Sequence, residues 1–132
     1  MEFSAKTKRG ETIKLRRETR SNVEFDQFSL SSDLYGQIGK VVLEIFYKPT
    51  MSDDEDYLYP SNSAALFDIE IFEESLRRQG RGSELLDIMI QYAKSRGATK
   101  FFAVNVPPEY ESWYAKRGFT PTDDRDRWYR EI

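Results

Sequence analysis

The chain contains neither cysteine nor histidine among its 132 residues. Without cysteine there can be no disulfides and no thiolate nucleophile, and without either residue the usual ligands of zinc are missing. Histidine is also the commonest general base in enzymes. We therefore expect no metal site, and any acid–base chemistry must come from carboxylates, tyrosines, lysines or water.

Long apolar runs are missing as well. No segment approaches the length that spans a bilayer, and the stretch Met1 to Lys6 lacks the apolar core of a signal peptide. We expect a cytoplasmic protein with no membrane partner. The formal net charge of −3 counts against nucleic acid as a partner, because an extended surface for phosphates is usually basic.

The length fits one ordinary domain that buries its own core, and the sequence shows no internal repeat. We predict a single domain over residues 1–132. Its parts are N-terminal strands (1–47), an acidic loop (48–65), a core (66–120) and a terminal strand (121–132).

The first half of the chain has the alternation and the β-branched and aromatic content of strands. The segments Val23–Leu30 and Ile38–Tyr47 are separated by a turn of hairpin length that contains Gly36, so we expect antiparallel neighbours. The segment 48–65 holds two prolines and the acidic run Asp53–Asp56. This composition predicts a long mobile loop, either a disordered, solubilising segment or one that attracts a cationic amine or a lysine-rich protein.

A strand is expected at Leu66–Phe72, where apolar and polar residues alternate. Phe67, Ile69 and Ile71 fall on one face, and Asp68, Glu70 and Phe72 on the other.

A helix should begin near Ser83, which can act as its N-cap, and end before Gly97. Its apolar stripe consists of Leu85, Leu86, Met89, Ile90 and Ala93.

The remaining elements are shorter. Lys100–Val106 has strand character, and the following two prolines block its continuation and suit the start of a helix over Glu109–Lys116, closed by Gly118. One or two terminal strands should follow, joined by the charged turn Thr122–Arg125.

Between the expected strand and helix lies a loop with three arginines and two glycines, Arg77 to Gly82. Glycines at a helix N-terminus let backbone N–H groups crowd around an anion, and the arginines add positive charge. The loop is not a nucleotide P-loop, because no lysine follows its second glycine, and it lacks the three glycines of a dinucleotide fingerprint.

This loop and a second motif together resemble the GNAT N-acetyltransferase superfamily. Arg77, Gly80 and Gly82 match the pattern Arg/Gln-x-x-Gly-x-Gly/Ala, and Trp113–Phe119 is similar to the family's aromatic-Tyr-x-Lys-x-Gly-Phe motif. The resemblance covers residues 66–120. It implies an α/β (α+β) fold with a central mixed, mostly antiparallel twisted sheet, a helix after the central strand and a short C-terminal helix. The N-terminal helices of the family are reduced or absent here, because residues 1–31 show no amphipathic helix.

The resemblance also implies acetyl-CoA as co-substrate, bound by the core 66–120. Backbone at Ile71, Phe72 and Glu73 would hold the pantetheine arm and the thioester carbonyl. The pyrophosphate would be bound by the loop and the helix start, namely Arg77, Arg78, Gln79, Gly80, Arg81, Gly82 and Ser83.

The implied reaction is direct attack of a neutral amine on the thioester. By its place in the second motif Tyr114 would be the general acid, and Glu70 or Asp68 could accept the amine proton if burial raises the pKa of the carboxyl. Each has an alternative interpretation: Tyr114 as a packing tyrosine, and Asp68 and Glu70 as an exposed strand face. Trp113 and Tyr114 should not share a helix face, so one of them should point into a cleft.

We thus expect an N-acetyltransferase that acts on a primary amine of a small molecule, a peptide N-terminus or a lysine. The alternative is a GNAT-like module that binds CoA or a partner protein without useful chemistry. A weaker alternative is a nucleic-acid contact through Arg77–Arg81 and the aromatics. Two copies could join through edge strands, since the last strand is expected to be short and exposed.

Overall fold

The computed structural model describes residues 2–8, 10–18, 27–72, 82–123 and 126–132. The chain forms two compact units, the first from residues 1–43 and 68–92, the second from residues 44–67 and 93–132. The strands β4 (Gly36–Phe46) and β7 (Ser63–Ile71) and the helix α2 (Gly82–Ser95) contribute residues to both units.

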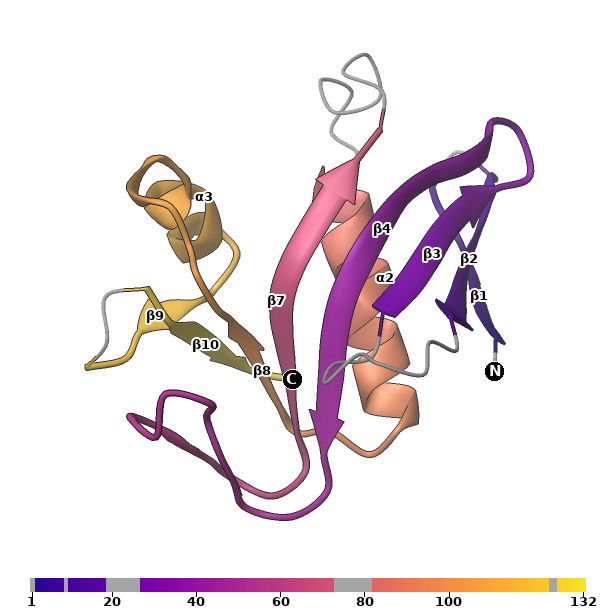
Figure 1. The fold of residues 1–132 in the computed structure, drawn as a ribbon. Helices are drawn as coiled ribbons and strands as arrows, with labels where there is room; N and C mark the ends of the chain where they lie inside the picture. The colour runs from indigo at the N-terminus through magenta and orange to yellow at the C-terminus, as the bar shows by residue number, and fades with distance from the viewer. Residues whose placement is uncertain (1, 9, 19–26, 73–81, 124–125) are drawn as a thin grey trace. The chain divides into compact units, whose positions relative to one another are not determined.

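In the first unit, β1 (Glu2–Lys6), β2 (Thr12–Glu18) and β3 (Gln27–Ser32) precede β4, and each strand pairs antiparallel with the next (Figure 1). Alternate side chains are buried along these strands, including Ile13 and Leu15. The predicted hairpin between β3 and β4 is confirmed, although residues 23–26 of its first segment lie outside the described residues.

The apolar side chains of helix α2 pack against the buried side chains of the strands in this unit. The side chains of the predicted stripe are buried, which confirms the helical spacing. Tyr92 packs edge-on against Phe3 of β1 at 5.6 Å and Phe28 of β3 at 5.3 Å between ring centroids. The helix begins at Gly82, so Ser83 lies in its first turn and is not the N-cap that the sequence suggested.

The end of α2 is the one predicted. Gly97 has a φ of +89°, and its N–H donates to the Lys94 carbonyl at 2.9 Å, while the Ala98 N–H reaches back to Ala93 at 3.0 Å. This pair of bonds is a Schellman motif, which requires the left-handed conformation that glycine adopts without strain.

In the second unit, β7 pairs in parallel with β8 (Lys100–Ala103), and β8 pairs antiparallel with β10 (Trp128–Glu131). The strand β9 (Thr120–Pro121) pairs with the first two residues of β10, so the first half of the last strand is not the exposed edge that we expected. The strand β7 also begins three residues before the predicted start, because the small buried residues from Ser63 to Ala65 pair with β8.

The segment 48–65, predicted to be a long loop, contains a small antiparallel ladder of β5 (Thr50–Met51) and β6 (Leu58–Tyr59). We call residues 50–59 the acidic arm. Ser52 closes its turn: the Ser52 hydroxyl donates to Asp56 at 2.6 Å and accepts from the Asp56 and Tyr57 N–H groups at 3.2 Å. Tyr59 is buried and stacks on Phe46 at 4.8 Å, so the arm is anchored by an aromatic side chain.

The predicted second helix is confirmed as a 3-10 turn (Pro108–Tyr110) followed by α3 (Glu111–Lys116), with Gly118 at a φ of +86° after its end. The observed fold is therefore the expected one, a mixed and mostly antiparallel sheet with a helix after β7 and a short C-terminal helix. Neither α2 nor α3, the α-helices of the described residues, has the length and apolar composition of a membrane span.

Candidate functional site

The predicted anion-binding loop lies largely outside the described residues. The loop positions outside them are Arg77, Arg78, Gln79, Gly80 and Arg81, and Glu73, predicted to hold the pantetheine arm, also lies outside them. The described part of the site begins with Gly82 and Ser83 in the first turn of α2, where Glu84 is the acidic residue. The N-terminus of a helix carries a partial positive charge, so this end of α2 suits an anion.

The end of β7 carries the other predicted backbone contacts. Ile71 is partly buried, Phe72 is 41% exposed, and the Phe72 N–H donates to the Ile38 carbonyl of β4 at 2.9 Å. Asp68 and Glu70 alternate with the apolar residues as predicted, and both are exposed. The burial that would prepare either carboxylate as a base is therefore not found.

The parallel ladder between β7 and β8 is short. It runs from Ser63 opposite Lys100 to Leu66 opposite Ala103, and the Val104 N–H adds one bond to the Leu66 carbonyl at 2.9 Å. The Val106 N–H then donates to Asp126, ahead of β10, at 3.0 Å. Strand β7 thus continues to Ile71 beyond its ladder with β8.

Gly39, near the start of β4, was not among the predicted site residues. A Cβ built on Gly39 would collide with the Glu70 carbonyl oxygen and would lie 3.3 Å from both the Glu70 carbonyl carbon and the Ile71 Cδ1. The backbone of β4 and the functional end of β7 therefore approach so closely that only glycine fits. A glycine inside a strand pattern is the sequence signal for such an approach, and it was available at Ile38-Gly39-Lys40.

Tyr114 belongs to the second unit, on α3. Its ring packs edge-on against Phe119 at 5.2 Å, and Phe119 in turn meets Phe101 of β8 at 6.2 Å. Burial raises the pKa of Tyr114 above its ordinary value, and the nearby Tyr110 adds to the rise. The phenol is therefore protonated at neutral pH. Within the described part of the chain, its hydroxyl makes no hydrogen bond.

Trp113 and Tyr114 are consecutive residues of α3. Their rings meet edge to face at 4.9 Å, and both side chains are partly buried. Arg117 explains the position of Trp113, because its guanidinium lies 3.7 Å from the Trp113 ring centroid and donates to the Trp113 carbonyl at 2.8 Å. The tryptophan is covered by this cation on one side.

The structure thus distributes the predicted residues over two units. Asp68, Glu70, Ile71 and Phe72 lie at the end of β7 in the first unit, together with the start of α2, and Tyr114 lies in the second unit. Among the described residues, no group of three or more carboxylates gathers as a metal site.

Comparison with known families gives one match. Residues 70–128 match the model of the Acetyltransferase (GNAT) domain, which confirms the resemblance that both sequence motifs predicted. No curated protein matches the sequence.

Comparison with solved structures shows the same fold. A mutant of the toxin AtaT, bound to the C-terminus of the antitoxin AtaR and acetyl-CoA, has a TM-score of 0.59 at 16% identity over 81% of this chain and 68% of that chain. The N-acetyltransferase PaiA from Thermoplasma acidophilum, in complex with coenzyme A, has a TM-score of 0.57 at 19% identity over 85% of this chain and 64% of that chain. AtaT complexed with acetyl-methionyl-tRNAfMet has a TM-score of 0.53 at 16% identity over 81% of this chain and 71% of that chain. The chain spans about two-thirds of the length of these neighbours.

Proposed function

We propose that the chain is an acetyltransferase that transfers the acetyl group of acetyl-CoA to a primary amine. The observation that carries the proposal is the match of residues 70–128 to the GNAT domain, because this segment contains both the arginine–glycine loop and the motif around Tyr114. The shared fold supports it.

The described residues suit acetyl-CoA in two respects. The start of α2 places Gly82 and Ser83 at a helix N-terminus, whose partial positive charge favours a pyrophosphate, and Arg77, Arg78 and Arg81 precede it in the sequence. The pantetheine arm is an extended chain with two amides. Such an arm can pair with a strand as another strand would, and β7 continues to Ile71 beyond its ladder with β8.

In the proposed reaction the amine nitrogen forms a bond with the carbonyl carbon, and the bond from that carbon to sulfur breaks. Tyr114 would give its phenolic proton to the departing thiolate and recover it from water. Its raised pKa suits this role, because the phenol remains protonated throughout the pH range in which an amine becomes a neutral nucleophile. A backbone N–H at the end of β7 would stabilise the oxyanion, but not that of Phe72, which donates to the Ile38 carbonyl.

The amine must also lose a proton. Asp68 and Glu70 are exposed, so we propose that either acts through water, not as a buried base. The acceptor is a primary amine of a small molecule, a peptide N-terminus or a lysine. Because the neighbour AtaT is described with acetyl-methionyl-tRNAfMet, the α-amine of an aminoacyl-tRNA belongs in the same test panel.

The first test is calorimetric titration of acetyl-CoA into the whole chain. The variant Gly80→Asp/Gly82→Asp should abolish binding, because two carboxylates would face the pyrophosphate. An aspartate at the first turn favours the helix itself, so α2 should persist. The matched variant Gly80→Asn/Gly82→Asn has nearly the same size without the charge and should bind more weakly than wild type but more tightly than the aspartate variant.

The outcome decides between two functions. If wild type does not bind acetyl-CoA, the proposal is wrong. If it binds acetyl-CoA and the full amine panel shows no acetylated product by mass spectrometry, the chain is a CoA-binding module.

A further inference from the structure

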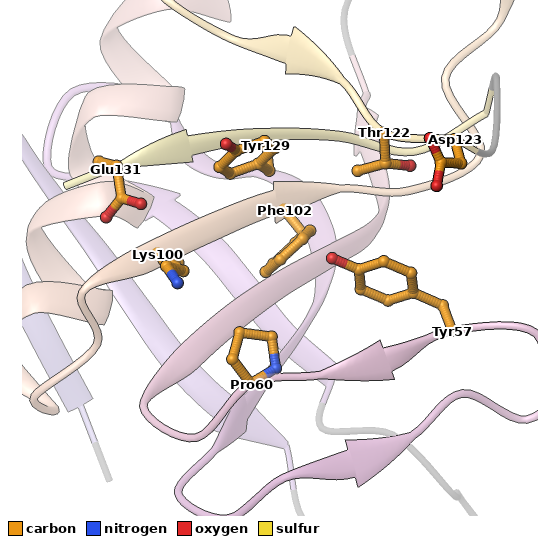
Figure 2. A pocket seen from close by; sticks show the side chains of 8 residues that line it. All are labelled: Tyr57, Pro60, Lys100, Phe102, Thr122, Asp123, Tyr129 and Glu131. Carbon is orange, nitrogen blue, oxygen red and sulfur yellow. The ribbon is translucent and has the colours of Figure 1, made fainter.

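A pocket of about 340 Å³ lies in the second unit, between the acidic arm and the strands β8 and β10. Figure 2 shows its lining: the Tyr57 ring reaches in from the arm, Phe102 and Tyr129 come from β8 and β10, and Asp123 lies at one end, with Lys100 and Glu131 at the other. None of these residues belongs to the site proposed for acetyl transfer.

The inner wall of the pocket is aromatic. Phe102 is 1% exposed, and its ring meets Tyr57 edge-on at 5.5 Å and stacks with Tyr129 at 5.8 Å. Phe102 lies on the opposite face of β8 from its neighbour Phe101, whose ring contacts Phe119 on the side of Tyr114. The pocket therefore lies on the face of β8 opposite Tyr114, so what it binds does not depend on the proposed chemistry.

The charges at the rim are unpaired and mainly negative. Lys100 and Glu131 are cross-strand neighbours, yet no ion pair within 4.0 Å joins them, nor does Asp123 have one, among the residues that the structure describes. The lining thus carries two carboxylates against one ammonium group. Unpaired carboxylates beside aromatic rings are the surroundings in which an organic cation is bound.

A buried arginine, Arg127, lies beside the pocket and links it to the acidic arm. Arg127, 5% exposed, lies with its Cζ 4.4 Å from the Tyr57 ring centroid, donates to the Tyr59 hydroxyl at 3.2 Å and pairs with Asp56 at 3.7 Å. These contacts fix the acidic arm next to the turn that carries Asp123. The rest of the arm's acidic run, residues 53–55, is exposed and precedes the pocket residue Tyr57 in the sequence.

We propose that this pocket binds an alkylammonium group, whose carbon stem lies against Tyr57 and Tyr129 while its charge faces Asp123 or Glu131. The acidic arm would attract the cation before it enters. Burial raises the pKa of Tyr57, so its hydroxyl remains neutral at physiological pH and its oxygen can accept a hydrogen bond from the ammonium. A polyamine and a lysine side chain share this chemistry.

The test is a titration of the ¹⁵N-labelled chain at low salt, followed by NMR, with spermidine and with the peptide acetyl-Gly-Lys-Gly-amide as probes. Both should shift the amide signals of Asp123, Tyr129 and Glu131, and the neutral 1,8-octanediol should not. Tighter binding of spermidine would identify a polyamine site, and tighter binding of the peptide a lysine site. Binding should weaken as sodium chloride is raised, because exposed charges are screened.

Two variants test whether binding depends on the carboxylates of this pocket. Asp123→Asn/Glu131→Gln should weaken spermidine binding roughly tenfold, since both exposed carboxylates lose their charge. Asp87→Asn removes an exposed carboxylate from α2 and should change nothing. The proposal is wrong if neither probe binds, if the double variant binds like wild type, or if the octanediol gives the same shifts. Because acetyl-CoA is absent from this experiment, its result is separate from that of the proposed function.

Discussion

The guanidinium of Arg127 lies over the ring of Tyr57, and the same group donates a hydrogen bond to the hydroxyl of Tyr59. The two tyrosines belong to the acidic arm, and Arg127 directly precedes β10. A single buried cation therefore joins a two-residue ladder to a part of the chain that follows far later in sequence. An arm this small has little stability of its own.

Replacing Arg127 by lysine should release the arm. Lysine keeps the charge but loses the planar guanidinium that stacks on Tyr57 and the Nε donor to Tyr59. We expect a loss of about 2 kcal/mol in the free energy of unfolding, measured by urea denaturation. Hydrogen exchange at the Ser52 amide, which donates to the Tyr57 carbonyl at 2.8 Å, should become faster. The matched control is Arg16→Lys on β2, which is exposed; an equal loss there would contradict this account.

Gly39→Ala should disturb the end of β7. The added Cβ would collide with the Glu70 carbonyl, and backbone cannot swing aside as a flexible side chain can. We expect a destabilisation of about 1–3 kcal/mol and, because Ile71 and Phe72 follow directly, weaker binding of acetyl-CoA. Gln37→Ala, at an exposed position of the same strand, serves as the control. An unchanged acetyl-CoA affinity in Gly39→Ala would show that this close approach matters only for stability.

Tyr114→Phe tests the proposed general acid. Removal of the phenol should lower kcat by roughly 100-fold, with little change in the KM for acetyl-CoA. The alkaline limb of the kcat profile in wild type should lie above pH 10, because burial raises the pKa of Tyr114, and Tyr114→Phe should lack it. Tyr110→Phe, an exposed neighbour, should retain nearly full activity. If Tyr114→Phe keeps wild-type kcat, Tyr114 is only a packing tyrosine.

Alkaline pH should also destabilise the fold through the buried phenols. Burial raises the pKa values of Tyr59 and Tyr114 in the folded state, so as pH rises past the ordinary value near 10 the unfolded chain loses these protons first. Stability is therefore complete below pH 10 and declines as pH rises through the folded-state pKa values. Urea unfolding of Tyr114→Phe between pH 8 and pH 11 should show a shallower decline than wild type. An identical decline would mean that Tyr114 titrates normally.

The strands with clear alternation could be predicted from sequence. In β7 the half-buried Phe67, Ile69 and Ile71 alternate with exposed side chains, and the pattern gave the correct faces. Its first residues could not be found, because Ser63, Ala64 and Ala65 are all buried and leave no alternation. The GNAT resemblance could be seen in the sequence because its two motifs lie among strands and helices that the periodicity of apolar residues predicts clearly.

The acidic arm was missed because nothing local specifies it. The composition of residues 48–65 is that of a loop, and the ladder depends on Tyr59, which is buried against Phe46, and on Arg127. The predicted role of Asp68 and Glu70 depended on burial, which a strand pattern of this kind does not determine. Gly39 is visible in the sequence as a glycine within a strand pattern. The sequence does not tell which backbone approaches it, because that depends on the path of β7.

The pairing of β8 with β10 has a consequence for the order in which the chain folds. One edge of β8 is covered by β7, which precedes it, whereas the other edge is covered by β10, which is made after the 3-10 turn, α3 and β9. During synthesis the apolar strand Lys100–Ala103 therefore presents an open edge until Trp128–Glu131 has emerged. Open apolar edges are where nascent chains aggregate. Substitutions in β10 should accordingly reduce the yield of soluble protein more than they impair the molecules that fold.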